Sequence, residues 1–182
     1  MKVSREQMAQ NRRRILEVAS QLFKDKGFDA VSVAEVMKAA GLTHGGFYGH
    51  FNSKDDLVAQ TLGHAIAADS FGDGKFSDFT RSYLTPRHRD NPGNGCPTAS
   101  LSAAIRHQTP AAKAAMAEGL RAQIVRIEGA LQEQDAANKR RAAIGSWAAM
   151  VGAVILARAV DDPELSDEVL DQTRAWIDAH VG

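Results

Sequence analysis

The sequence has 182 residues, with 22 Lys or Arg and 22 Asp or Glu, so its formal net charge is zero. A chain of this length buries a core without disulfide bonds, and its single cysteine, Cys96, excludes an intrachain disulfide framework and suits a reducing cytoplasm. The first residues lack the apolar core of a secretory signal. The longest uncharged stretch, between Arg141 and Arg158, is shorter than the roughly 20 apolar residues of a membrane span. We therefore predict a cytoplasmic protein without a membrane segment.

The charge is unevenly distributed along the chain. Residues 1–54 carry nine Lys or Arg and five Asp or Glu, whereas the remainder carries 13 basic and 17 acidic residues. A basic N-terminal part on an acidic body suggests that the N-terminal part meets a polyanion.

Residues 5–26 are predicted to form the first helix, because apolar residues recur at helical spacing at Ile15, Val18, Ala19, Leu22 and Phe23. Gly27 ends this helix. The run Arg12–Arg14 precedes the apolar stripe and has two interpretations. It is either a solvated basic face, or a strip that flanks a duplex and contacts phosphates without reading sequence.

Residues 32–51 are predicted to form two short helices joined by a tight turn. Ser32 can cap the first helix and Thr43 the second. Gly41 supplies the positive φ that the turn between them needs. The apolar face of the first helix consists of Val33, Val36, Met37 and Ala40, and the second buries Phe47 and Phe51.

Three glycines, Gly45, Gly46 and Gly49, weaken the second of these helices. Each costs about 1 kcal/mol relative to alanine, and sequences tolerate such losses where function requires them. With Phe47 pointing inward, the opposite face is nearly bare backbone edged by His44 and Tyr48. A DNA major groove admits one α-helix, and small residues let that helix approach base edges closely.

Residues 32–54 resemble the helix-turn-helix of the TetR (tetracycline-repressor-like) family of bacterial transcriptional regulators. The matching residues are Ala39-Ala40-Gly41-Leu42-Thr43, Gly45, Phe47-Tyr48, His50-Phe51, Lys54 and Leu57. The resemblance extends weakly over residues 8–65 and then fades, as is typical of that family's divergent ligand domains. The alternative is an ordinary helical hairpin with no nucleic-acid role.

The resemblance implies an all-α protein of about nine helices. A three-helix DNA-binding head would occupy residues 1–53, and an effector-binding and dimerisation domain residues 54–182. His44, Gly45 and Gly46 would approach the bases. The positions implied to contact phosphates are Thr43, Tyr48, His50 and Lys54, joined by Ser32. Because Gly46 and Gly49 offer no side chain, DNA shape or bridging water would contribute to recognition.

Residues 54–68 are predicted to form the next helix, with Asp55 and Asp56 in its first turn, where negative charge is favoured. A turn-rich break follows at residues 69–75, and then a short helix at residues 76–84. From Thr85 onward we expect a long loop, which contains three prolines and two glycines and ends at Pro97.

Cys96 is expected at or beside the N-cap of a helix that runs from Pro97 to about His107. A thiol at a helix N-terminus near cations is more nucleophilic, and Arg87, His88 and Arg89 precede it in the loop. Cys96 is therefore either an oxidant or electrophile sensor or a plain buried thiol. The spacing of the nearby histidine and aspartate fits no standard metal site, so no metal is predicted.

The last three predicted helices span residues 110–134, 139–159 and 166–180, with a break at Ala136, Ala137 and Asn138. The helix 139–159 is apolar on nearly every side, which indicates burial on nearly every side. By the family resemblance, the last two helices pair with their copies in a homodimer, over residues 139–180. The alternative is that they only close the core of one chain.

We predict a homodimeric repressor that binds a palindromic DNA operator and is released by a small-molecule effector, without a cofactor. Candidate pocket residues are Phe71, Phe76, Phe79, Tyr83, Cys96, His107, Met116 and Trp147. One alternative is a regulator that senses oxidants through Cys96. A competing class is an enzyme with Cys96 as nucleophile and His88 or His107 as base, but no orienting third group is evident, so no catalytic residue is predicted.

Overall fold

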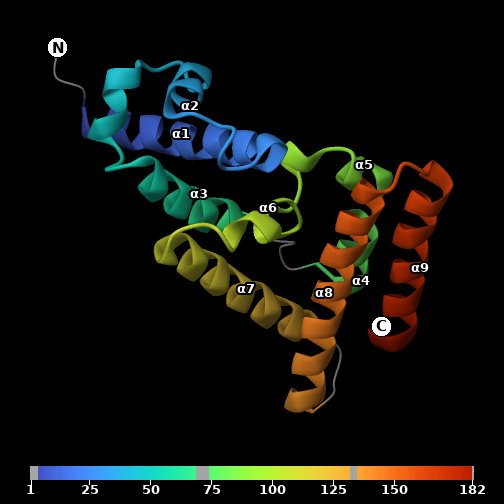
Figure 1. Cartoon of the computed structure of the whole chain (residues 1–182). Coiled ribbons are helices and arrows are strands. Elements are labelled where there is room, and N and C mark those ends of the chain that lie inside the picture. The colour runs from blue at the N-terminus through green and yellow to red at the C-terminus, as the bar shows by residue number, and fades with distance from the viewer. Residues whose placement is uncertain (1–3, 69–73, 132–134, 182) are drawn as a thin grey trace. The chain divides into compact units, whose positions relative to one another are not determined.

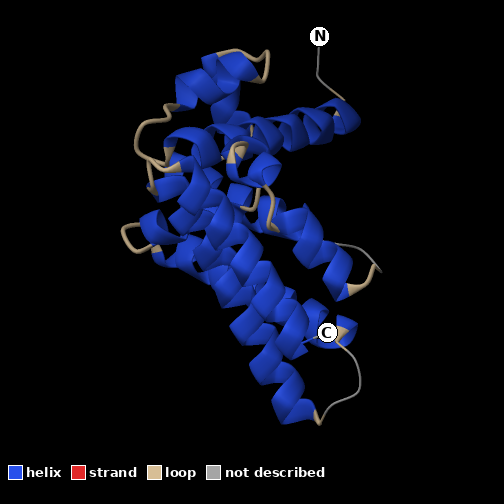
Figure 2. Cartoon of the chain, turned by 90° about the vertical axis from the view of Figure 1, so that its right-hand side faces the viewer, coloured by secondary structure: helices blue, strands red, loops and turns tan. Residues whose placement is uncertain are grey.

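The computed structural model describes residues 4–68, 74–131 and 135–181. Within these residues every regular element is a helix (Figure 2), which confirms the predicted all-α class. The elements in chain order are α1 Arg5–Lys26, α2 Val33–Ala39, the 3₁₀ helix η1 His44–Gly49, α3 Lys54–Ala68, α4 Phe76–Tyr83, α5 Pro86–Arg89, the 3₁₀ helix η2 Pro92–Asn94, α6 Pro97–Ile105, α7 Pro110–Ala130, α8 Ala136–Ala159 and α9 Pro163–Val181.

The chain divides into two compact units that do not follow sequence order. The first comprises Met1–Asp69 and Cys96–Glu118, and the second Ser70–Gly95 and Gly119–Gly182. In the first unit α1 contacts α2, α3 and α6 (Figure 1), so α6 closes a core otherwise built from the N-terminal helices. The predicted functional boundary between residues 53 and 54 stays a prediction.

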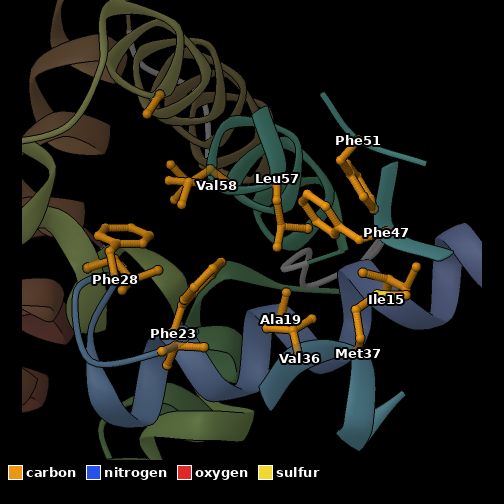
Figure 3. Close-up of a cluster of buried hydrophobic side chains, with 14 of the residues drawn as sticks. Ile15, Ala19, Phe23, Phe28, Val36, Met37, Phe47, Phe51, Leu57 and Val58 are labelled. Atoms are coloured by element: carbon orange, nitrogen blue, oxygen red, sulfur yellow. The ribbon is translucent and has the colours of Figure 1, made fainter. Parts of the chain in front are cut away.

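The core of the first unit joins α1, α2, η1 and α3 through apolar side chains. Figure 3 shows Ile15, Ala19 and Phe23 of α1 directed toward Phe47, Leu57 and their neighbours. Phe23 and Phe28 pack with ring centroids 5.3 Å apart across the end of α1. The full set of buried members is Ile15, Ala19, Phe23, Phe28, Val31, Val36, Met37, Ala40, Phe47, Phe51, Leu57, Val58, Leu62, Leu101, Ile105 and Ala112.

Local signals account for the bounds of the N-terminal helices. Ser4 and Ser32 cap α1 and α2, each accepting a 3.1 Å bond from the backbone N–H three residues on. Gly27 and Gly41 end these helices with φ of +80° and +69°, a region that glycine enters without steric cost. Ser53 accepts from Asp56 N at 3.0 Å at the start of α3.

In the second unit, α8 and α9 pack along each other, and α4 also contacts α9. Buried Met150, Val154 and Leu170 lie in these two long helices. At one end Arg158 of α8 donates to the backbone oxygens of Arg89 and His88 at 2.8 and 3.0 Å, which fastens α5 to α8.

Several predicted bounds are wrong. The break expected at residues 136–138 is the first turn of α8, because Asp135 accepts from the N–H groups of Ala137 and Asn138 at 3.0 and 3.1 Å. Similarly, α9 starts at Pro163, since Asp162 accepts from two backbone N–H groups and proline suits the first helical position. Helix α7 ends at Ala130 instead of near residue 134; residues 132–134 lie outside the described part.

The segment expected as one long loop after residue 84 contains α5 and η2. Thr85 caps α5 by accepting from His88 N at 3.2 Å, and Pro86 occupies the first helical position. Proline at the first position likewise opens η2 and α6. The prolines that suggested a loop therefore start three short helices. The turn-rich break at residues 69–75 falls mostly outside the described residues.

By length and composition, α8 is apolar enough to cross a membrane: its most apolar 18-residue window has a mean hydropathy of 1.6. The length of the uncharged stretch does not by itself exclude a membrane span. A core helix meets the same test, and α8 buries Ser146, Trp147, Met150 and Val154 within its own unit.

Candidate nucleic-acid interface

Helix α2, the turn at Gly41 and η1 form a helix-turn-helix. The turn closes with hydrogen bonds from Gly41 N to Lys38 O at 3.0 Å and from Leu42 N to Met37 O at 2.9 Å. The φ of +69° at Gly41 favours glycine here, whereas the nearest atom to an added Cβ, Arg14 Nη2 at 3.2 Å, is the end of a flexible side chain that can move. The turn thereby fixes η1 beside α2.

The second helix of this motif is a 3₁₀ helix, although the sequence predicted an ordinary α-helix. Its three glycines reduce the preference for α geometry, and short 3₁₀ helices are common as connectors and at the ends of α-helices. The predicted Thr43 cap is also absent: the Thr43 side chain makes no capping hydrogen bond, and its backbone oxygen accepts from Gly46 N at 3.0 Å instead.

Most of the predicted DNA-contacting residues lie on the surface of the first unit. Phe47 is 1% exposed and points into the core, whereas Tyr48 is 71% exposed. His50 and Lys54 are half-buried at the following bend and at the start of α3. The remaining exposed members of the predicted set are Ser32, Thr43, His44, Gly45 and Gly46. Their contacts with DNA stay predictions.

The glycines of η1 are not required by the fold of this chain. None of Gly45, Gly46 and Gly49 has a positive φ. A Cβ on Gly45 would meet nothing within 4 Å, one on Gly46 would lie 3.6 Å from Thr43 Oγ1, and one on Gly49 would lie 3.9 Å from Met8 Cε. The chain has room for side chains at these positions and presents bare backbone.

A polar network surrounds the segment between η1 and α3. Arg12 of α1 donates from Nη1 to His50 O at 2.6 Å, and its guanidinium lies 4.6 Å from the centroid of the Phe51 ring. Arg12 Nη2 also donates to Gln60 Oε1. Gln60 Nε2 in turn donates to Asp56 Oδ1 at 2.6 Å, and Asp56 Oδ2 accepts from Asn52 N at 2.9 Å.

Two pKa values in this segment are shifted. Burial, and secondarily the Arg12 charge, lowers the pKa of His50 below its ordinary value of 6.5. A neutral imidazole at pH 7 meets a phosphate as an N–H donor and not as a cation. Hydrogen bonds from the Asn52 backbone and then from Gln60 lower the pKa of Asp56 below 3.8, so its carboxylate stays charged.

The predicted pocket residues are divided between the two units. Phe79, Tyr83 and Trp147 pack together in the second unit. The ring centroid of Trp147 lies 6.2 Å from that of Phe79 and 5.5 Å from that of Tyr83. Phe76 joins Phe79 at 6.4 Å. Trp147 Nε1 is buried and has no hydrogen-bond partner among the described residues. Phe71 lies outside the described residues.

The other three candidates, Cys96, His107 and Met116, belong to the first unit. His107 is exposed and Met116 packs against the apolar core. Cys96 is the N-cap residue of α6, as predicted, and is 1% exposed. Such burial favours the plain thiol over a reactive one. Within the described residues, no three His, Cys, Asp or Glu side chains are arranged to hold a metal.

Sequence reasoning missed the role of Gln60 and the partners of Arg12. Gln60 lies one helical turn after Asp56, a spacing at which polar side chains interact, and that pair was a usable signal. The contacts of Arg12 span 38 and 48 residues, and no local pattern reports them.

In its described ranges the chain is all-helical, and its N-terminal unit presents this motif on its surface, as proteins of the helix-turn-helix DNA-binding class do. The model of a family described as "Bacterial regulatory proteins, tetR family" matches residues 15–61. Residues 15–61 of this chain are thus similar to the N-terminal helix-turn-helix region of that family.

Curated relatives match over the same region. The HTH-type transcriptional regulator AcrR of Shigella flexneri is 39% identical over 57 residues, which are 31% of this chain and 26% of that protein. The HTH-type transcriptional repressor KstR2 of Rhodococcus jostii is 34% identical over 76 residues, 42% of this chain and 36% of that protein. The match therefore spans only about a quarter to a third of these relatives.

Solved structures match over nearly the whole chain and show the fold. The reduced form of E. coli NemR has a TM-score of 0.77 at 24% identity, covering 95% of this chain and 97% of that one. A TetR-family transcriptional regulator from Agrobacterium tumefaciens has a TM-score of 0.72 at 19% identity, covering 96% and 100%.

Proposed function

We propose that this chain is a cytoplasmic transcriptional repressor that binds a palindromic DNA operator as a homodimer and is released by a small-molecule effector. The observation that carries the proposal is the exposed, glycine-rich face of η1. Because neither backbone conformation nor internal packing requires those glycines, close approach of a partner surface explains them. The relatives named as transcriptional regulators and repressors support the same function.

In this proposal, Gly45, Gly46 and His44 face the base edges. Tyr48, His50 and Lys54 donate to phosphates, with Ser32 and Thr43 at the flanks. Phosphate contacts supply most of the affinity and make it salt-dependent. With only one imidazole among the base-facing positions, the operator is recognised largely through its shape and through bridging water.

The proposed dimer forms through α8 and α9. Both helices expose apolar side chains after packing against each other: Leu156 of α8 is 58% exposed and Trp176 of α9 is 50% exposed. Other exposed apolar residues on the two helices and their junction are Ile144, Ile155, Val160 and Leu165. Exposed apolar surface of this kind marks association sites, and a two-fold dimer pairs the same surface of both copies.

The proposed effector site is the aromatic cluster of the second unit. Aromatic walls with few polar groups are typical of small-molecule sites, and the partnerless Trp147 Nε1 supplies a donor for a ligand acceptor. Effector binding would favour a conformation whose two heads no longer match the operator. In Trp176→Phe, Trp147 is the single tryptophan left, so its fluorescence reports ligand binding directly.

The decisive test is a footprint of the purified protein on the DNA flanking its own gene, together with its mass in solution. We expect a dimer protecting two half-sites whose centres are about 34 Å apart or a multiple of that distance. A monomer without salt-sensitive affinity for any duplex contradicts the proposal.

A second candidate is an oxidant-sensing regulator, favoured by the position of Cys96 at the N-cap of α6 and opposed by its burial. Repeating the footprint with a thiol oxidant separates the two. Release of the DNA by oxidant in the wild type, abolished in Cys96→Ala, identifies Cys96 as the sensor.

We do not expect this protein to be an enzyme, because its relatives are named as regulators.

A further inference from the structure

Arg12 differs from its neighbours in the basic run of α1. Arg13 and Arg14 are exposed, whereas Arg12 is half-buried. Its guanidinium binds three separate groups: the backbone oxygen of His50, the side-chain oxygen of Gln60 and the face of the Phe51 ring. The charge of Arg12 is therefore directed into the protein.

The groups that Arg12 joins belong to different elements. His50 is the residue that ends η1, and its carbonyl is one of the helix-terminal groups that a helix leaves without an internal partner. Gln60 lies in α3, and its amide continues to Asp56, which holds Asn52. Arg12 thus links α1, the end of η1 and α3 through one planar side chain.

We propose that Arg12 is a positioning residue for DNA recognition, which sets the orientation of η1 and the bend at residues 50–52 instead of contacting a phosphate. This inference rests on the proposed function, because it assigns a role within the same DNA-binding surface. Tyr48 and Lys54 flank the bend that Arg12 holds, so a change at residue 12 reaches both through the backbone.

The role depends on the shape of arginine as well as on its charge. A guanidinium donates in two directions in one plane and stacks on an aromatic ring, whereas a lysine ammonium is a compact charge on a flexible stem. Lysine at a phosphate-contacting position preserves the attraction. At residue 12, lysine has one nitrogen in place of the separate Nη1 and Nη2 that bind the His50 and Gln60 oxygens, and it has no planar group to cover the Phe51 ring.

The test uses Arg12→Lys in the full-length protein, with Arg13→Lys as the matched control. We expect Arg12→Lys to weaken affinity for the footprinted operator by about tenfold, within the range by which residues that do not touch a ligand change its binding, and Arg13→Lys to bind as the wild type. Stoichiometric titration should show that the active fraction is unchanged. Wild-type affinity in Arg12→Lys, or a loss explained wholly by a smaller active fraction, overturns the proposal.

A second measurement is independent of DNA. The chain has two tyrosines, Tyr48 in η1 and Tyr83 in the other unit. In protein labelled with fluorotyrosine, Arg12→Lys should shift the ¹⁹F resonance of Tyr48 and leave that of Tyr83 in place, while Arg13→Lys moves neither. An unmoved Tyr48 resonance overturns the positioning role. Failure of the wild type to bind any duplex overturns the proposed function and leaves this spectroscopic result standing.

Gln60→Met extends the test to an uncharged member of the network. Methionine keeps the length of the side chain but cannot accept from Arg12. We expect Gln60→Met to weaken operator binding in the same direction, and the double variant with Arg12→Lys to lose less than the product of the two single effects, as residues of one network do. Full multiplicativity of the two losses contradicts a shared role.

Discussion

Phe47 and Phe51 stack with ring centroids 5.6 Å apart and an interplanar angle of 27°, and both rings are buried in the first unit. This pair anchors η1 to the core from one side. Tyr48 follows Phe47 directly and is therefore directed outward, where it packs edge-on at 5.3 Å from the Phe47 ring. Because these two phenylalanines bury one side of η1, the opposite side, which carries Tyr48, is the proposed DNA surface.

Lys54→Ala should weaken binding to all duplex sequences. Lys54 starts α3 immediately after the capping residue Ser53, a position suited to a phosphate. Loss of one phosphate contact lowers the slope of log affinity against log salt by about one. Binding isotherms at several salt concentrations measure this, and Lys75→Ala, in the other unit, is the control with an unchanged slope.

Tyr48→Phe provides the uncharged counterpart of that experiment. It removes a hydroxyl donor, so affinity should fall for specific and non-specific DNA alike, with the salt slope preserved and the dimer intact. If both Tyr48→Phe and Lys54→Ala retain wild-type affinity, these residues do not contact DNA.

Gly45→Ala should separate stability from recognition, because Gly45 is one of the residues proposed to face the bases. The new methyl group fits, since a Cβ at this position would meet nothing within 4 Å. Removal of a glycine stabilises such a segment by up to about 1 kcal/mol. We therefore expect an equal or higher melting temperature together with weaker operator binding. Gly63→Ala in α3, where a Cβ also meets nothing within 4 Å, should leave DNA binding unchanged.

The two tryptophans should respond oppositely to a charge. Trp147 is 3% exposed within the aromatic cluster, so Trp147→Lys buries an unpaired cation and should unfold the second unit. Trp176 is half-exposed on the proposed dimer surface, so Trp176→Lys should yield a folded monomer. Circular dichroism and sedimentation distinguish these results; a wild-type dimer in both variants would remove α8 and α9 from the interface.

His50 should make stability fall as the pH is lowered. Its folded-state pKa lies below the ordinary 6.5, so the unfolded chain takes up a proton before the folded one does. The contribution is fully present above pH 6.5 and is lost as the pH falls through that value toward the folded pKa. Urea midpoints at pH 8 and pH 5.5 should differ less in His50→Gln than in the wild type.

The helices with an apolar stripe and a cap or stop signal were predictable from the sequence. The bounds of α1 and α3 agree with prediction because Gly27 and the Ser53–Asp56 start are local signals. Asp135 and Asp162 were missed as caps because an aspartate beside small residues or proline also marks a turn. The Arg12 network was not predictable, since its contacts arise only when α1 and α3 pack.

The candidate surface followed from the glycine pattern, but its 3₁₀ geometry did not. Glycine spacing shows which positions lack side chains. It does not show whether backbone hydrogen bonds join residues three apart, as in a 3₁₀ helix, or four apart, as in an α-helix. The pocket candidates stay a prediction, and the sequence did not reveal that they divide between two units: aromatic or soft character does not show into which unit a residue folds, and Cys96, His107 and Met116 belong with the N-terminal helices.

The assignment of α6 to the first unit has a consequence for dissecting this protein. Leu101 and Ile105 complete the same core as Val58 and Leu62, although some 40 residues separate the two pairs in sequence. A fragment ending at residue 68 would retain the whole helix-turn-helix, but it would expose the apolar side chains of α3 that α6 covers. Such a fragment should aggregate, whereas grafting residues 96–118 onto it through a flexible linker should restore a soluble DNA-binding module.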